Sequence, residues 1–327
     1  MTRVAAVDCG TNTIRLLVAD LTREETGRPR LEPLRRRNEI VRLGQGVDRT
    51  GLLDPAALER TLAVVEDYAA DCAELGVEPG RGARRFVATS ATRDARNREA
   101  FAAGVRSLLG VDPEVVSGQE EAHLSFAGSL LGARGTDDGG APRLVVDLGG
   151  GSTELVLGVD APAAAISLNT GSVRITERYL ADGVSPAAEA AARAEVRGLL
   201  DRAAQAVDLA ATGRLVGLAG TITTVTAHAL GLADFDAEAI DGAELAVGAA
   251  LASCDAIVHS TAAERESWAY LRPGRRDVIA AGALVWSEVI SRVVAETTAA
   301  GRPLATAVTS LHDILDGIAL SLAVPVP

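Results

Sequence analysis

The sequence predicts an α/β protein built from two lobes, and three observations support this prediction. Its 327 residues are too many for one ordinary hydrophobic core and suit two domains. Short apolar runs alternate with longer helical patterns, within a composition of 48% hydrophobic and 23% charged residues that is typical of a globular protein. A strand–turn–strand plan also occurs twice, at residues 4–19 and 144–159. We therefore expect one lobe at 1–131 and a second at 132–327, with the terminal helix able to pack back on the first lobe.

The repeated plan is a buried strand that ends in Asp-x-Gly, a turn of small residues and a second apolar strand. Its turns lie at 8–13 and at 147–153. A tight turn of this kind exposes consecutive backbone N–H groups, which form a concave site for an anion. The two copies therefore predict two lobes of one ancestral design, each with a turn that faces phosphate.

Helix and strand signals predict the other elements in order. Asp54 caps and Pro55 begins a helix that runs to about residue 75. In the second lobe, Ser185 and Pro186 begin a helix that runs to about residue 211 in the same way, and the end of the chain is mainly helical. The glycine-rich polar stretch 132–140 marks the lobe boundary. The remaining predicted elements are a strand at 84–89, a helix at 94–109, a strand at 114–116 and a helix at 119–131.

Charge and composition exclude several classes of function. The net charge is −12, which disfavours general binding to nucleic acid. All 32 basic residues are arginine, and the absence of lysine rules out a standard P-loop and Schiff-base chemistry. A bound phosphate must then be held by backbone N–H groups, hydroxyls, arginine or a metal. The densest basic run, Arg35–Arg37, is expected on a solvated strand face.

Cysteine usage and hydropathy indicate a cytoplasmic protein. Cys9, Cys72 and Cys254 are odd in number and far apart, which suggests free thiols in a reducing compartment. The N-terminus leads directly into a strand and has no signal-peptide pattern. Residues 215–233 lack charge over a membrane-length stretch, but their glycines and threonines favour a strand, a turn and a helix. We therefore expect no membrane association.

The two turns supply the candidate phosphate-binding residues. Three successive glycines in the second turn allow backbone to approach an anion without Cβ interference, although a flexible hairpin is the alternative. The acidic residues Asp8, Asp147 and Glu154 flank the turns and are candidate ligands of a hydrated cation. The predicted binding residues are Asp8, Gly10, Thr11, Asn12, Thr13, Gly149, Gly150, Gly151, Ser152 and Thr153.

Glu121 and Arg93, which lie between the turns, are candidate catalytic residues together with Asp147 and Glu154. Arg93 stands where a strand enters a helix and could contact phosphate, although a Ser/Thr cap with surface arginines also explains the segment. Ser117 and Glu120 have the spacing of a capping box, which gives Glu120 a structural role. Glu121 lies about 100° further round the helix. It is therefore the candidate general base, with an ordinary first-turn glutamate as the alternative.

A third glycine turn lies in the second lobe. Residues 217–221 end a strand and open a helix, so Gly220 and Thr221 are candidates for contacting an anion or a nucleotide. A close contact between helix and strand explains this turn equally well. The pair His312-Asp313 lacks the accompanying histidine spacing of a metal site, so we expect a packing or surface role for it.

These motifs together resemble the exopolyphosphatase / guanosine pentaphosphate phosphohydrolase family. The resemblance covers nearly the whole chain and rests on segments in the family's order. These are the turn at 8–16, residues 89–97, Ser117–Ala122, the turn at 147–154, Gly171–Arg174, Ala219–Thr221 and Arg275–Ala283.

The resemblance implies a two-lobed actin-like ATPase (ribonuclease H-like) fold with the active site in the interlobe cleft. It implies hydrolysis of the terminal phosphoanhydride of polyphosphate or of guanosine pentaphosphate (pppGpp) with Mg²⁺, or with Mn²⁺ in its place. Glu121 matches the family's catalytic base, while Asp147, Gly149 and Glu154 match the second phosphate turn and its metal environment. A homodimer is compatible with this family.

The match is to the short form of the family, without the C-terminal helical domain that extends the binding channel. Together with the acidic net charge of −12, this leads us to expect a preference for short polyphosphate, with Arg272, Arg275 and Arg276 as further candidate contacts or as a helix-start cluster. Two rival functions remain open. One is a pppGpp 5′-phosphohydrolase, and the other is an actin-like, ATP-binding kinase or chaperone.

Overall fold

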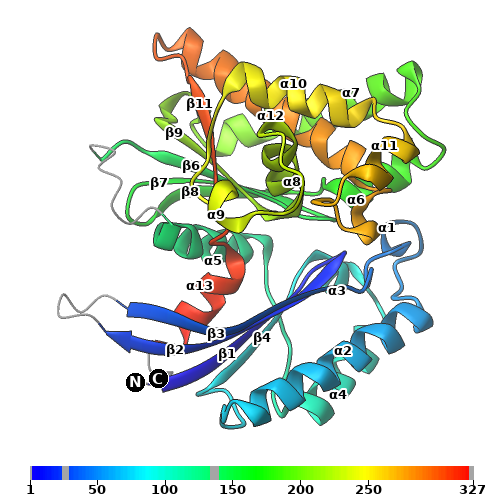
Figure 1. The fold of residues 1–327 in the computed structure, drawn as a ribbon, viewed down its shortest axis with the longest axis vertical. Coiled ribbons are helices and arrows are strands. Elements are labelled where there is room, and N and C mark those ends of the chain that lie inside the picture. The colour runs from blue at the N-terminus through cyan, green and yellow to red at the C-terminus, as the bar shows by residue number, and fades with distance from the viewer. Residues whose placement is uncertain (1, 24–28, 133–139, 324–327) are drawn as a thin grey trace. The chain divides into compact units, whose positions relative to one another are not determined.

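The computed structural model describes residues 2–23, 29–132 and 140–323, and the chain divides into two compact units (Figure 1). Unit 1 comprises the residues up to Gly128 together with those from Ile314 onward, and unit 2 is Ser129–Asp313. The C-terminal helix, for which packing on the first lobe was considered from the sequence, belongs to unit 1. Most of the predicted boundary stretch 132–140 lies outside the described residues.

Unit 1 contains a five-stranded mixed sheet in the order β3-β2-β1-β4-β5. β1 is antiparallel to β2 and parallel to β4, β3 is antiparallel to β2, and β5 is parallel to β4. The strands are β1 (Thr2–Cys9), β2 (Thr13–Arg23), β3 (Pro29–Ile40), β4 (Arg84–Ala88) and β5 (Glu114–Val115).

Helices cover both faces of this sheet because successive strand residues point to opposite sides. Val7 and Cys9 of β1 pack with one hydrophobic cluster that contains residues of α2 and α4, whereas Val4 and Ala6 pack with a second cluster that contains residues of α5 and α13. The helices of unit 1 are α1 (Val47–Thr50), α2 (Pro55–Glu74), α3 (Ser90–Asp94), α4 (Arg98–Leu109), α5 (Gly118–Gly132, which continues into unit 2) and α13 (Ile314–Ser321).

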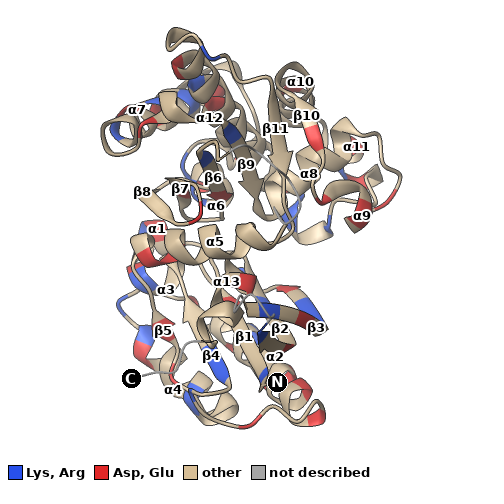
Figure 2. Cartoon of the chain, turned by 90° about the vertical axis from the view of Figure 1, so that its left-hand side faces the viewer, with Lys and Arg blue, Asp and Glu red and all other residues tan. Residues whose placement is uncertain are grey.

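Specific contacts attach the C-terminal helix α13 to unit 1. The buried carboxylate of Asp316 pairs with Arg36 of β3 at 2.5 Å. Gly317 lies so close to α5 that an added Cβ would stand 1.9 Å from the Leu124 carbonyl oxygen. The other two arginines of the basic run, Arg35 and Arg37, share Asp71 of α2. The basic run Arg35–Arg37 was expected on a solvated strand face, but the structure places all three side chains in ion pairs. Figure 2 shows the basic and acidic residues interspersed along β3.

Unit 2 contains a six-stranded sheet in the order β10-β11-β9-β6-β7-β8. If β6, β7, β8, β9 and β11 are matched to the five strands of unit 1, the order and the directions are the same, and β10 is an addition at the edge. The duplication predicted from the two turns is therefore present, and both units have the predicted α/β, ribonuclease H-like arrangement. The strands are β6 (Arg143–Leu148), β7 (Thr153–Gly158), β8 (Pro162–Leu168), β9 (Arg214–Leu218), β10 (Glu244–Ala246) and β11 (Thr306–Thr309).

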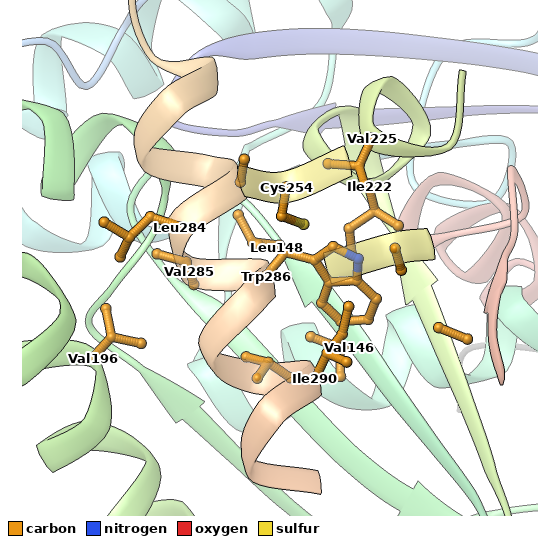
Figure 3. Close-up of a cluster of buried hydrophobic side chains, with 14 of the residues drawn as sticks. Val146, Leu148, Val196, Ile222, Val225, Cys254, Leu284, Val285, Trp286 and Ile290 are labelled. Atoms are coloured by element: carbon orange, nitrogen blue, oxygen red, sulfur yellow. The ribbon is translucent and has the colours of Figure 1, made fainter. Parts of the chain in front are cut away.

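The core of unit 2 is centred on Trp286 of α12, which is one of only two tryptophans (Figure 3). It packs against Val146 of β6 and Ile222 of α8 within a large aliphatic cluster. An added Cβ on Gly217 would lie 2.7 Å from Ile222 and 3.1 Å from Trp286, so this glycine allows both helices to approach β9 closely. The helices are α6 (Ser172–Ile175), a π-helical turn (Thr176–Leu180), α7 (Pro186–Ala206), α8 (Ala219–Ala229), α9 (Ala237–Ile240), α10 (Val247–Val258), α11 (Ala262–Ser267) and α12 (Ile279–Ala299), with 3₁₀ turns at Leu209–Ala211 and Pro273–Arg275.

Most of the predicted elements are present, with instructive exceptions. The helix expected at 94–109 begins only at Arg98, as α4, and a separate short helix, α3, precedes it. Between them Asn97 bonds the backbone N–H and carbonyl of Leu53. The predicted helix from Pro186 ends at Ala206 rather than near 211. The strands β10 and β11 interrupt a region expected to be mainly helical. In the described part of the chain, no helix has the length and apolarity needed to cross a membrane.

Candidate active site

The polar residues of unit 1 gather at the carboxyl ends of its parallel strands. The first turn follows β1, α3 follows β4, and α5 follows β5. Backbone hydrogen bonds join the ends of these strands: Thr89 N–H donates to Cys9 O at 3.1 Å, and Val116 N–H donates to Ala88 O at 3.2 Å. Ligand sites of α/β sheets lie at this edge. The sheet therefore brings together the first turn, Arg93 and Glu121.

The first turn presents N–H groups because its carbonyls are held on the opposite side. Gly10 N–H donates to Thr13 O at 2.9 Å and closes the turn. The carbonyl of Thr11 accepts from Gly44, and that of Asn12 accepts from the backbone N–H groups of residues 41 and 42. In a trans peptide the C=O and the following N–H point in opposite directions. The N–H groups of Asn12 and Thr13 therefore point away from residues 41–44, and neither has an acceptor in the described part of the protein.

Side chains around the first turn are held in place by buried polar contacts. Arg15 is the cross-strand partner of Asp8, and its Nε and Nη2 donate to Asp8 Oδ2 at 2.9 and 2.7 Å. Thr11 Oγ1 lies 2.9 Å from Ser90 Oγ at the start of α3. Burial, assisted by the charge of Asp8, raises the pKa of the Cys9 thiol well above its usual value. Cys9 is therefore a neutral packing residue.

Glu121 and Arg93 form an ion pair in the same cluster. Arg93 Nη1 donates to Glu121 Oε2 at 3.2 Å and to the Val116 carbonyl at 2.8 Å. Glu121 is only 7% exposed, whereas Glu120 points outward and pairs with Arg85 at 2.8 Å. The opposite orientations of these two glutamates match the helix-face argument made from the sequence.

The capping box predicted at the start of α5 is only half formed. The backbone N–H of Glu120 donates to Ser117 Oγ at 3.2 Å. The Glu120 carboxylate accepts from Arg85 rather than from the backbone N–H of Ser117. The prediction was wrong on this second bond because a nearby guanidinium on β4 offers a charged donor, which makes a stronger hydrogen bond than a backbone amide.

The second turn, in unit 2, has the same construction. Gly149 N–H donates to Ser152 O at 3.0 Å. The first N–H groups of α6 bind its carbonyls: Ser172 donates to Gly149 O at 3.0 Å, and Val173 donates to Gly150 O at 2.9 Å. The N–H groups of residues 150 and 151 therefore point away from α6, and the described residues offer them no acceptor. This array of N–H groups is suited to an anion.

Two buried carboxylates stand side by side next to the second turn. Asp147 and Glu154 are directly opposed on β6 and β7 and are 7% and 1% exposed. Ser167, the next residue across on β8, donates its hydroxyl to Glu154 Oε1 at 2.7 Å. In proteins Mg²⁺ is commonly bound through one or two carboxylates, with water and substrate oxygens completing its shell. The chemistry of this pair therefore fits Mg²⁺.

The described residues contain no set of three or more His, Cys, Asp and Glu side chains arranged to hold a metal. The predicted metal ligands accordingly fall into two places. Asp147 and Glu154 are neighbours in unit 2, and Asp8 lies in unit 1 beside Arg15. The metal role of Asp8 stays a prediction.

The third turn also lies at the carboxyl edge of the unit 2 sheet. It follows β9, and Ala219 adopts a left-handed backbone with φ of 72° at the start of α8. The Arg275 guanidinium lies against Gly220, where an added Cβ would stand 0.8 Å from Nη1. Gly282 of α12 is in similar contact with Thr221. The contact of Arg275 with Gly220 brings a cation to the start of a helix, where an anion would be stabilised.

Several residues of these clusters were not predicted from the sequence as site residues. Arg15 could have been found by counting across the first hairpin, because its register follows from the turn at 10–13. Ser167 lies one strand further on, where an irregular register between β7 and β8 at Leu157/Gly158 prevents such counting. Arg174, whose Nε donates to the Gly151 carbonyl at 2.8 Å, belongs to a segment recognised only by resemblance. The hydrogen bond is not visible in the sequence because it joins elements 23 residues apart.

Comparison with known proteins identifies the family. The family model described as the Ppx/GppA phosphatase family matches residues 21–299. The chain belongs to the Ppx/GppA phosphatase family. It is 44% identical over 329 aligned positions to exopolyphosphatase 2 of Mycobacterium tuberculosis, with 99% of each chain covered.

Solved structures agree with this assignment. A crystal structure of an exopolyphosphatase-like protein has a TM-score of 0.90 and 42% identity, covering 98% of this chain and 97% of the other. A Ppx/GppA family member from Aquifex aeolicus has a TM-score of 0.75 and 25% identity, covering 98% and 97%. Ppx/GppA phosphatases are metal-dependent, which agrees with the paired carboxylates of unit 2.

Proposed function

We propose that this protein is an exopolyphosphatase that hydrolytically releases orthophosphate from the end of inorganic polyphosphate. The observation that carries the proposal is the 44% identity, across 99% of both chains, to a protein named exopolyphosphatase 2. The two N–H-lined turns support it, because a chain of phosphates offers anionic oxygens to both. The substrate is held without lysine by backbone N–H groups, hydroxyls and arginine.

In the proposed mechanism both clusters serve one reaction. The turns at 10–13 and 149–152 bind oxygens of the terminal phosphates, which supplies much of the electrostatic stabilisation that phosphoryl transfer requires. Glu121 orients a water molecule and accepts its proton as the new P–O bond forms. The shortened polyphosphate leaves as an anion, so no strong general acid is needed. Arg93 donates to Glu121 Oε2 at 3.2 Å and thereby orients the buried carboxylate.

Asp147 and Glu154 are the proposed metal-holding residues. A bound Mg²⁺, or Mn²⁺, would supply positive charge to neutralise phosphate oxygens. Ser167 holds the Glu154 carboxylate in place by donating to Oε1, an arrangement typical of the outer shell of metal sites. In this proposal Asp8 acts with Arg15 as a support for the first turn, and its predicted role as a metal ligand is secondary.

A second candidate function is the hydrolysis of pppGpp. The observation that favours it is the third turn, where Gly220 and Thr221 meet Arg275 at the start of α8, because a guanosine nucleotide would need contacts beyond its phosphates. The candidate from another class is an ATP-binding kinase or chaperone of the same fold. The buried Glu121 favours hydrolysis over these.

One experiment ranks these candidates. Orthophosphate release is measured from short polyphosphate, pppGpp and ATP at equal concentrations with Mg²⁺. We expect polyphosphate to give the highest kcat/KM. Faster release from pppGpp would establish the second candidate instead, and turnover of ATP only in the presence of a phosphoryl acceptor would establish a kinase.

We also propose a cytoplasmic location. Cys9, Cys72 and Cys254 are all buried, free thiols, which suits a reducing compartment. Burial raises the pKa of Cys254 to about 12, so this thiol stays protonated and unreactive. Immunodetection in fractionated cells tests the proposal, and recovery outside the cytoplasmic fraction would contradict it.

A further inference from the structure

Arg174 is a buried arginine of α6 that contacts the second turn on its carbonyl side. It is the third residue of α6, is 9% exposed, and donates from Nε to the Gly151 carbonyl at 2.8 Å. Its backbone N–H donates to the Gly150 carbonyl at 3.1 Å. A single residue therefore binds two successive carbonyls of the turn.

The contact with Gly151 determines the direction of the next N–H group. The Gly151 carbonyl and the Ser152 N–H belong to one trans peptide and point in opposite directions. Holding the carbonyl toward α6 therefore presents the Ser152 N–H on the opposite side, with the N–H groups of Gly150 and Gly151. Consecutive glycines resist a peptide rotation less than other residues do. A turn of this composition needs a restraint from outside.

The first turn is restrained differently. The carbonyl of Asn12, which corresponds to Gly151, accepts from the backbone N–H groups of Val41 and Arg42 at 3.0 and 2.9 Å. The residues around it, Thr11 and Thr13, carry side chains that limit backbone freedom. Unit 1 thus achieves the orientation with backbone donors, whereas unit 2 uses one guanidinium.

We propose that Arg174 is a positioning residue for phosphate binding: it holds the 151–152 peptide so that the Ser152 N–H faces the bound phosphate. Removing the guanidinium leaves the Gly151 carbonyl without this charged donor. The peptide can then rotate and turn a carbonyl toward the anion. As a consequence of the proposed function, the same rotation weakens catalysis on polyphosphate.

Two substitutions and one control test this inference. Arg174→Met removes the donor while keeping an apolar stem, and Arg174→Lys keeps a charge without the planar geometry. Arg193→Gln is the control, because Arg193 is a part-buried arginine of the same unit that pairs with Glu288 on α12. The probe is inorganic phosphate, whose binding is measured from the rise in Tm with phosphate concentration. The second readout is kcat/KM for short polyphosphate.

We expect Arg174→Met to raise the Kd for inorganic phosphate by about 10- to 100-fold, the usual effect of losing a hydrogen bond to a charged group. Arg174→Lys is expected to lie between this variant and the wild type. Arg193→Gln is expected to lower the Tm without phosphate but to leave the phosphate Kd unchanged. The kcat/KM of the Arg174 variants should fall in parallel with their phosphate affinity.

The outcomes separate this inference from the proposed function. If the wild type binds phosphate but does not hydrolyse polyphosphate, and Arg174→Met loses phosphate binding, the inference stands and the proposed function fails. Phosphate affinity equal to that of the wild type in Arg174→Met overturns the inference. If Arg174→Met does not fold, unchanged affinity in Arg174→Lys overturns it. An absence of phosphate binding by the wild type also overturns it, because the turn would then not be an anion site.

Discussion

The two hairpins of the molecule have the same backbone construction but differ in charge at one of two paired positions. Each turn is closed by one hydrogen bond, Gly10 to Thr13 at 2.9 Å and Gly149 to Ser152 at 3.0 Å. In each hairpin a buried aspartate stands two residues before the first glycine of the turn. The residue opposite Asp8 is Arg15, whereas the residue opposite Asp147 is Glu154.

This difference teaches that a duplicated backbone can serve two chemical tasks. In unit 1 Asp8 is paired with Arg15 and Glu121 with Arg93, so each carboxylate has a guanidinium beside it. In unit 2 two carboxylates are opposed on neighbouring strands, an arrangement that a divalent cation stabilises. We propose that unit 1 provides the general base and unit 2 the metal ligands, while both turns bind phosphate.

The largest effect is expected from Glu121→Gln. Removing a general base lowers kcat by roughly 10²–10⁴-fold, while the amide keeps the shape of the side chain. The matched control is Glu120→Gln on the same helix turn, which breaks an exposed ion pair with Arg85. Such pairs are worth about 0.2–1 kcal/mol, so kcat should be nearly unchanged. Steady-state phosphate release measures both variants. If Glu120→Gln is the more damaging change, the base has been assigned to the wrong glutamate.

A smaller loss of activity is expected from Gly171→Ala, which displaces the second turn from the side of α6. An added Cβ would stand 2.6 Å from the Gly150 carbonyl oxygen and 2.7 Å from that of Gly149, so the turn must shift. We expect a destabilisation of about 1–3 kcal/mol, as for other overpacked sites, with a lower kcat/KM.

Gly198→Ala in the middle of α7 is the control for that change. An added Cβ there would meet nothing within 4 Å, and replacing a helical glycine stabilises by roughly 0.5–1 kcal/mol. Thermal unfolding and polyphosphate kinetics separate the two variants. Unimpaired kinetics in Gly171→Ala would show that the turn need not be held against α6.

Ser167→Ala is expected to have a moderate effect that is confined to metal affinity. Its hydroxyl donates to Glu154 Oε1 at 2.7 Å, and losing such a partner of a ligand weakens metal affinity by about 10-fold or more. The control is Ser253→Ala, which removes a buried hydroxyl that donates to the Val225 carbonyl in the same unit. Activity as a function of Mg²⁺ concentration should shift only for Ser167→Ala. Equal curves for both variants would remove Ser167 from the metal environment.

The smallest effect on activity is expected from reagents that modify thiols. Burial raises the pKa values of Cys9, Cys72 and Cys254, so their reactive thiolate forms are scarce at neutral pH. A reagent that counts thiols should therefore react slowly with the native protein. After unfolding it should modify all three cysteines. Rapid loss of activity through modification of Cys9 would show that unit 1 opens at the first turn.

Much of this arrangement could be predicted from the sequence because it depends on local patterns. The apolar strands, the Asp54 and Ser185 caps and the two glycine-rich turns are local signals, and the structure has all of them. The orientation of Glu121 also follows from local geometry, since one step along a helix turns a side chain by about 100°.

The rest depends on contacts between distant segments. At the break before α4, the N-cap residue Asn97 bonds Leu53, 44 residues earlier, and this contact could not be predicted from the local sequence. The place of α13 depends on the ion pair between Asp316 and Arg36, which are 280 residues apart. The support of the second turn by Arg174 is of the same kind. The roles of the individual site residues remain predictions that mutagenesis must test.

The most direct test of the account is the Mg²⁺ requirement of two matched variants. Asp8→Asn and Asp147→Asn change equivalent residues of the two hairpins, and polyphosphate hydrolysis is measured against Mg²⁺ concentration for each. We predict that Asp147→Asn raises the Mg²⁺ concentration for half-maximal activity by about 10- to 100-fold. Asp8→Asn is predicted to lower the maximal rate while leaving this concentration unchanged, because Asp8 is paired with Arg15. An equal shift in both variants, or a shift in Asp8→Asn alone, would contradict the division of tasks between the hairpins.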